Sequence, residues 1–265
     1  MTCSPMLRVF AVCAMLPVLV SCSSGENGGG GDSVKLNGAG ASFPAPLYSK
    51  WFKAYNAAHP NIMVDYQSVG SGQGVRSFID DTVDFGASDA AMTPEEMSQV
   101  ARGVQLLPMT AGSIVLAYNL EGVDNLKLSR DTYVGIFLGK ITKWNDEAIK
   151  KDNMGANLPA TDINVVVRSD GSGTTYVFTK HLSEISTDFA ASPGTNKLPA
   201  WPVGAKSKGN EGVTASIKTT PGSIGYVEYG YAANTGLSMA ALQNNAGDFV
   251  EPTIAASQAG LESAS

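Results

Sequence analysis

Cysteine and histidine are scarce in this chain: its 265 residues include three cysteines and two histidines. His59 and His181 each stand without a partner at the spacing of a metal site or a catalytic triad. The cysteines are Cys3, Cys13 and Cys22, all near the amino terminus. The chain beyond Cys22 therefore has no thiol for a disulfide bond or a metal site, and its stability must come from packing.

Basic runs are also missing, and the formal net charge is -6. An acidic protein without a lysine-rich or arginine-rich segment is a poor partner for nucleic acid or for an anionic membrane surface. The glycine-rich segment 171–175 (GSGTT) lacks the lysine of a nucleotide-binding phosphate loop, and no Gly-x-Ser-x-Gly nucleophile motif occurs. These absences favour a binding protein over an enzyme and predict no metal or other cofactor.

The apolar run at residues 9–20 is too short to cross a bilayer and follows Arg8, as in a secretory signal. It ends in LVSC (19–22), which resembles a bacterial lipobox with Cys22 as the lipidated residue; alternatively, Cys22 is only a small residue near a cleavage site. We expect residues 1–22 to be a lipoprotein signal peptide and residues 23–33, with four consecutive glycines at 28–31, to be a flexible tether. The protein is then exported and anchored to the cell envelope by lipid.

Three glycine-rich and serine-rich segments precede predicted helices. They are 38–44 (GAGASFP), 70–74 (GSGQG) and 168–175 (RSDGSGTT). A helix start presents unpaired backbone N–H groups and the positive end of the helix dipole, which together favour an anion. Arg168 adds a planar set of donors, and Ser172, Thr174 and Thr175 add hydroxyls. Each segment alone is also compatible with an ordinary turn, but three of them indicate a shared anionic ligand.

Strand-like and helix-like segments alternate from residue 34 onward, which predicts an α/β fold with a mostly parallel sheet. We expect a helix at 44–58, a helix at 176–182 and a loop at 197–212. The expected strands are 34–36, 62–67, 83–86, 106–110, 113–118, 161–167 and 222–229. The chain is expected to cross between lobes near residue 113, giving lobe 1 at 34–113 and lobe 2 at 114–265.

Asp89 follows the short predicted strand at 83–86, at the carboxyl end where open α/β sheets bind ligands. Asp89 could instead cap the next helix. Thr93 is better placed for that role, because Pro94 follows it and Glu96 occupies the third helical position. Asp89 is therefore left free of the capping role.

Five motifs in order carry a resemblance to a known family. They are 38–46 (GAGASFPAP), 86–90 (GASDA), 139–145 (GKITKWN), 168–174 (RSDGSGT) and 222–229 (GSIGYVEY). Over residues 34–248 the chain resembles the phosphate-binding protein of the bacterial high-affinity phosphate ABC transporter, the PstS family. The resemblance implies a two-lobed periplasmic-binding-protein fold of class II type that buries one dehydrated phosphate and delivers it to an ABC permease.

The resemblance also implies a set of phosphate contacts. They are Ser42, Phe43 through its backbone N–H, Ser71, Asp89, Arg168, Ser172, Gly173 and Thr174, with Asp170 supporting Arg168. Members of the family continue further and return to the first lobe, so the C-terminal return strands are expected to be missing here. An extracellular phosphate sensor or a phosphate-ester hydrolase using the same anion site remain alternative functions.

Overall fold

The computed structural model of the chain describes residues 33–262. The predicted signal peptide, Cys22 and nearly all of the predicted tether lie outside them. Within the described residues, no helix combines the length and the apolar character needed to cross a bilayer.

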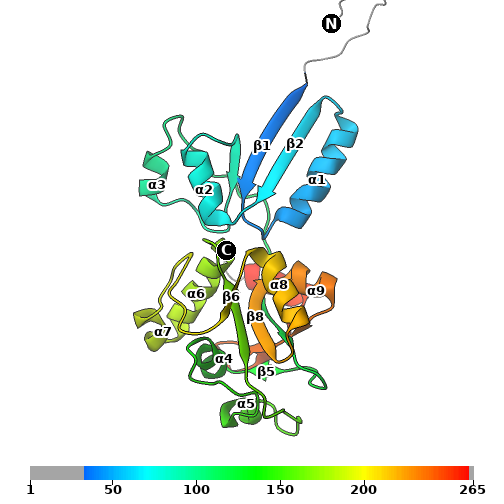
Figure 1. The fold of residues 1–265 in the computed structure, drawn as a ribbon, viewed down its shortest axis with the longest axis vertical. Helices are drawn as coiled ribbons and strands as arrows, with labels where there is room; N and C mark the ends of the chain where they lie inside the picture. Colours follow the sequence, from blue (N-terminus) through cyan, green and yellow to red (C-terminus); the bar gives the residue numbers. More distant parts are fainter. Residues whose placement is uncertain (1–32, 263–265) are drawn as a thin grey trace, which may run out of the picture. The chain divides into compact units, whose positions relative to one another are not determined.

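A first sheet of three parallel strands forms in the order β2-β1-β3. Its strands are β1 (Val34–Gly40), β2 (Ile62–Ser68) and β3 (Phe85–Ala87). The crossovers contain α1 (Ala45–Ala58) and α2 (Ser71–Ile79), and Figure 1 shows α1 beside β2. These elements confirm the predicted strands and the predicted helix after residue 44, although β1 extends to Gly40. A Cβ at Gly40 would overlap the Ala87 carbonyl, so only glycine lets β1 and β3 approach this closely.

Beyond β3, the short helix α3 (Pro94–Ser98) begins with the predicted capping box. Thr93 Oγ1 accepts a hydrogen bond from the Glu96 N–H at 3.2 Å, and Glu96 Oε2 accepts one from the Thr93 N–H at 2.9 Å. The strand predicted at 106–110 is wrong, because this segment is irregular. It has no strand to pair with, and Leu107 is 64% exposed. We call residues 34–98 the first region.

A second, five-stranded sheet has the order β7-β6-β8-β4-β9. Its strands are β4 (Ile114–Asn119), β6 (Asn164–Arg168), β7 (Ala205–Ser207), β8 (Ser223–Glu228) and β9 (Ser238–Met239). β6 runs parallel to β7 and β8, whereas β4 is antiparallel to both β8 and β9. The prediction of a mostly parallel sheet therefore holds for the first sheet and fails for the second. We call residues 114–239 the second region; the predicted lobe boundaries stay a prediction.

Helices cover both faces of the second sheet. They are α4 (Arg130–Phe137), α5 (Glu147–Asp152), α6 (Gly173–Ile185), α7 (Thr187–Ala191), α8 (Gly209–Thr219) and α9 (Tyr229–Thr235). Alternate strand residues contribute to two core clusters: Leu116 packs with residues of α4 and α6, whereas Val115 packs with residues of α8. The loop predicted at 197–212 is wrong in part, because it contains β7 and the start of α8.

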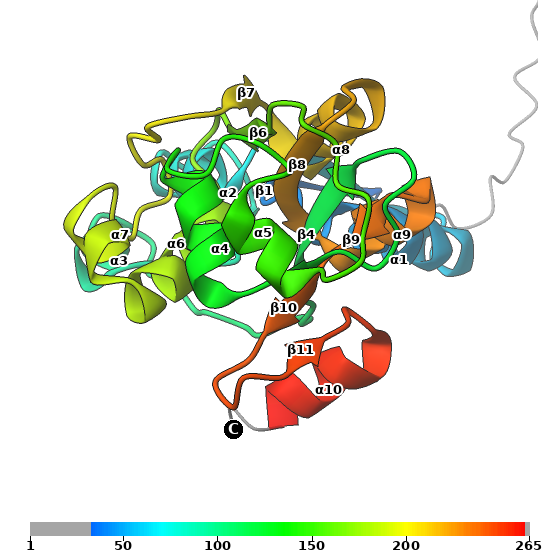
Figure 2. The ribbon, with the colours of Figure 1, turned by 90° about the horizontal axis from the view of Figure 1, so that it is seen from below.

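The remaining elements lie at the carboxyl end of the described chain. β10 (Ala241–Gln243) pairs with β5 (Lys127–Leu128) and with β11 (Phe249–Val250), and α10 (Ile254–Glu262) follows. Figure 2 shows α10 beside β11. Ser257 of α10 shares a hydrogen bond of 2.8 Å with Ser113, just before β4. Within residues 33–262 the first sheet consists of β1, β2 and β3, so no strand after β3 joins it.

Candidate anion-binding site

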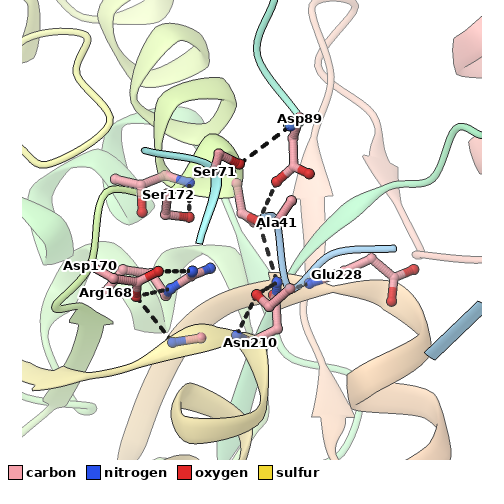
Figure 3. Close-up of polar contacts among 12 residues, drawn as sticks. Ala41, Ser71, Asp89, Arg168, Asp170, Ser172, Asn210 and Glu228 are labelled. Atoms are coloured by element: carbon pink, nitrogen blue, oxygen red, sulfur yellow. Dashed lines mark hydrogen bonds and ion pairs between the residues drawn. The ribbon is translucent and has the colours of Figure 1, made fainter. Parts of the chain in front are cut away.

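The structure brings the predicted site residues together at strand ends and helix starts. Ser42 and Phe43 follow β1, Ser71 begins α2, Asp89 follows β3, Arg168 ends β6, and Ser172, Gly173 and Thr174 begin α6. Two contacts connect the regions closely: Thr174 Oγ1 donates to Asp89 Oδ2 at 3.0 Å, and the Gly72 N–H donates to the Gly171 carbonyl at 2.8 Å. Figure 3 shows Ser71, Asp89, Arg168 and Ser172 in one close-up of polar contacts, with Ser71 and Asp89 joined by a hydrogen bond.

Arg168 is the last residue of β6 and is only 2% exposed. Its Nε and Nη2 atoms donate to the two carboxylate oxygens of Asp170 at 2.8 and 2.5 Å. Burial acts to raise the pKa of Asp170, but the hydrogen bonds and charge of Arg168 and the Gly209 N–H outweigh it and hold that pKa below its usual range. Asp170 thus accepts hydrogen bonds from two nitrogen atoms of the guanidinium. Among residues 33–262, the buried Nη1 atom of Arg168 has no hydrogen-bond partner.

Three buried serines in the site each accept a backbone hydrogen bond. Ser42 Oγ accepts from Asn210 N at 3.0 Å, Ser71 Oγ from Asp89 N at 3.3 Å, and Ser172 Oγ from Thr175 N at 3.0 Å. All three serines are 1% exposed. A hydroxyl whose oxygen accepts an N–H keeps its proton for donation elsewhere. Together with Arg168 Nη1, these hydroxyls form a set of hydrogen-bond donors.

Asp89 supplies an acceptor beside these donors. Burial raises the pKa of the Asp89 carboxyl to about 6, although the hydrogen bonds from Thr174 and the charge of Arg168 act to lower it. The carboxylate of Glu228 adds a smaller effect that raises it. Asp89 is therefore still mostly ionised at neutral pH and can accept a hydrogen bond from a protonated ligand.

Phe43 and Gly173 contribute through their positions. Phe43 is partly buried and lines a cleft that Asp89 and Thr174 also reach. A Cβ on Gly173 would lie 2.6 Å from both Ser71 Oγ and the Asp89 Cβ, so a side chain there does not fit. The predicted contact of a ligand with the Phe43 N–H stays a prediction.

Sequence reasoning missed Asn210, which lies in the segment predicted as a loop. Asn210 donates from both its backbone N and its Nδ2 to Ser42 Oγ, at 3.0 and 2.9 Å. The sequence did contain a signal for a helix start at this position. Segment 209–212 (GNEG) precedes Val213 and Ile217, which share one helical face. It is therefore a fourth glycine-containing helix start.

Further hydrogen bonds connect the two regions around the site. Tyr231 OH donates to the Ser42 carbonyl at 2.7 Å, and Lys197 Nζ forms an ion pair with Glu96 Oε1 at 3.1 Å. Within the second region, the Lys197 carbonyl accepts a hydrogen bond from the Ser172 N–H at 2.9 Å. No group of three or more histidine, cysteine, aspartate or glutamate side chains within residues 33–262 is arranged to hold a metal. The arrangement suits a small tetrahedral oxyanion held by hydrogen bonds.

Comparisons with known proteins identify relatives of this chain. The family model described as a PBP superfamily domain matches residues 25–265. A phosphate-binding protein PstS of Pasteurella multocida is 50% identical over 222 residues, which cover 82% of this chain and 63% of that protein. The PstS of Methanocaldococcus jannaschii is 38% identical over 264 residues, covering 92% of this chain and 68% of the relative.

A similar solved structure is a phosphate ABC transporter substrate-binding protein of Clostridium perfringens with bound phosphate, described as putative in function. It is 20% identical, has a TM-score of 0.65, and the match covers 87% of this chain and 82% of that one. At this identity the match supports the fold alone. The chain spans less than two thirds of the length of the Pasteurella relative.

Proposed function

Since this chain belongs to the PstS family of phosphate-binding proteins within the PBP superfamily, we propose that it binds inorganic phosphate and delivers it to an ABC permease. Phosphate binds between the first and second regions in this proposal. The relatives are named as binding proteins. We propose likewise that this chain releases its ligand chemically unchanged and is not an enzyme.

The observation that carries this proposal is the unpaired Nη1 atom of the buried Arg168. A charged donor without a partner in a buried position is costly, so an anion that accepts its hydrogen bond is strongly favoured. The hydroxyl protons of Ser42, Ser71 and Ser172 are further hydrogen-bond donors in the site. A phosphate oxygen can accept each of these bonds.

The remaining contacts follow the family motifs. The Phe43 N–H and the N–H groups of Gly173 and Thr174 at the start of α6 donate to phosphate oxygens. Asp89 accepts the proton that phosphate still carries near neutral pH. Asp170 holds the guanidinium plane of Arg168 in place.

Calorimetric titration of the purified chain with phosphate and with sulfate tests the function. We expect tight binding of phosphate, much weaker binding of sulfate, and no hydrolysis of a generic phosphate ester.

Arg168→Ala should weaken phosphate binding by about 100-fold or more, because one partner of a buried charged network is lost. Arg76→Ala is the matched control, since Arg76 pairs with Asp80 on the surface. Absence of phosphate binding by the parent chain would exclude the function, and ester turnover would instead favour the hydrolase.

We also propose that Cys22 is lipidated and anchors the protein to the cell envelope. The support is the LVSC sequence at 19–22 and the glycine-rich segment that follows. Cys22→Ser should abolish acylation and shift the protein from the membrane fraction to the medium or periplasm, because in this proposal the acyl chains hold it at the membrane. Metabolic labelling with a fatty acid measures this. Cys13→Ser is the control, and unchanged labelling of Cys22→Ser would contradict the assignment.

A further inference from the structure

Asn210 uses every polar group it has. Its backbone N–H and its Nδ2 donate to Ser42 Oγ, and Nδ2 also donates to Thr174 Oγ1 at 3.3 Å. Its Oδ1 accepts from the Glu228 N–H at 2.9 Å, and its carbonyl accepts from Thr214 Oγ1 at 2.8 Å. The side chain is 0% exposed. The Glu228 N–H requires an acceptor, which fixes the amide so that Nδ2 faces the two hydroxyls.

This arrangement determines where the Ser42 proton points. A serine hydroxyl has two acceptor lone pairs and one proton. Asn210 fills both lone pairs, one through its N–H and one through Nδ2. The hydrogen bonds of Ser42 Oγ within residues 33–262 all use it as an acceptor, so its proton is left to donate to a ligand. The Ser42 hydroxyl is buried, and a ligand that accepts the proton completes its hydrogen bonding.

We propose that Asn210 is a positioning residue that directs the Ser42 hydroxyl proton at the bound anion, an inference that rests on the proposed phosphate binding. Asn210 belongs to the second region and Ser42 to the first. The two hydrogen bonds therefore form only when the regions are together. Asn210 thereby makes one phosphate contact depend on the approach of the two regions.

A double-mutant cycle in the purified full chain tests this role, with phosphate affinity measured by calorimetry. Asn210→Ala should weaken phosphate binding about tenfold when Ser42 is present, because the Ser42 proton is no longer directed at the charged ligand. In a Ser42→Ala background the same change should cost no more than about twofold, the remainder acting through Thr174. A structural role that acts through the other contacts of Asn210, with Thr214 and Glu228, would give the same loss in both backgrounds.

Asn119→Ala is the matched control. Asn119 Nδ2 also makes two hydrogen bonds, to the Ile217 and Lys218 carbonyls near the far end of α8, and faces no site residue. The Asn119→Ala variant should alter the melting temperature without altering phosphate affinity.

If Asn210→Ala fails to fold, Asn210→Asp replaces it in the cycle, because the aspartate keeps an acceptor for the Glu228 N–H. Its carboxylate would accept the Ser42 proton, so its loss of affinity should also shrink in the Ser42→Ala background.

The outcomes are distinguishable. If the parent chain does not bind phosphate, the proposed function fails and this inference fails with it. If the parent binds phosphate and the loss caused by either Asn210 substitution is equal in the two backgrounds, the inference alone is overturned. A coupling of about fivefold or more between positions 42 and 210 supports it.

Discussion

Asp89 and Arg168 face the same site but act on a bound anion in different ways. Arg168 and the helix starts attract any tetrahedral anion. Asp89 can pair with the proton of phosphate, whereas fully ionised sulfate would leave its carboxylate unpaired against like charge. The amide of an Asp89→Asn variant can also donate a hydrogen bond, so it can pair with sulfate. The variant should therefore lower the ratio of phosphate affinity to sulfate affinity by at least about tenfold. Titration of the parent and the variant with both anions measures the ratio.

Asp65→Asn is a suitable control for this experiment, because Asp65 lies on β2 in a surface ion pair with Lys35. It should leave both affinities unchanged. An Asp89→Asn protein that still excludes sulfate as strongly as the parent would show that another group provides the selectivity.

Local sequence could identify some site residues and could not identify others. Arg168, Ser172 and Thr174 lie within one short motif, and their chemistry follows from its position between a strand and a helix. Asn210 has no such signal for its main contact, because Ser42 lies 168 residues away along the chain. The partner appears only when the first region meets the start of α8. Sequence therefore predicts donor segments, and the fold decides which of them support one another.

The start of α6 needs glycine at position 173 for space. A Cβ there would lie 2.6 Å from Ser71 Oγ and the Asp89 Cβ. Gly173→Ala should push the first region away from α6 and weaken phosphate binding by roughly 10-fold to 100-fold, since overpacking costs about 1–3 kcal/mol. Gly171→Ala is the control, because its Cβ would meet only the Gly72 backbone, at 3.4 Å or more. Calorimetry measures the phosphate affinity of both variants. Equal phosphate affinities of the two variants would contradict the steric argument.

Elements with strong apolar periodicity or clear caps were predictable, such as α1 and the capping box of α3. Segment 106–110 has the composition of a strand but forms none, because strand formation needs a neighbouring edge and its apolar side chains remain partly exposed. β7 is the opposite case, because it forms a strand without the composition of one. Its three residues show no apolar alternation, and they pair with β6 because the fold brings the two segments together. Gly209, with a φ of +70°, then turns the chain into α8.

At the scale of the whole molecule, the hydrophobic core is unevenly placed. Both buried apolar clusters of the described chain draw their residues from position 114 onward. The first region instead relies on strand pairing and on helices such as α1, in which Tyr48 alone is buried. Its hydrogen bonds to the second region, including Tyr231 to the Ser42 carbonyl, therefore matter for its stability as well as for the site.

The pairing of Arg168 with Asp170 has a consequence for how fast an anion arrives. The positive charge of Arg168 is already matched, Asp89 and Glu228 lie nearby, and the whole chain has a formal net charge of -6. An approaching phosphate is thus repelled at long range and attracted only at hydrogen-bonding distance. Added salt screens the repulsion but not the buried bonds. Stopped-flow measurements should show an association rate that rises with ionic strength and a nearly constant dissociation rate; an association rate that falls with salt would instead indicate electrostatic attraction of the ligand.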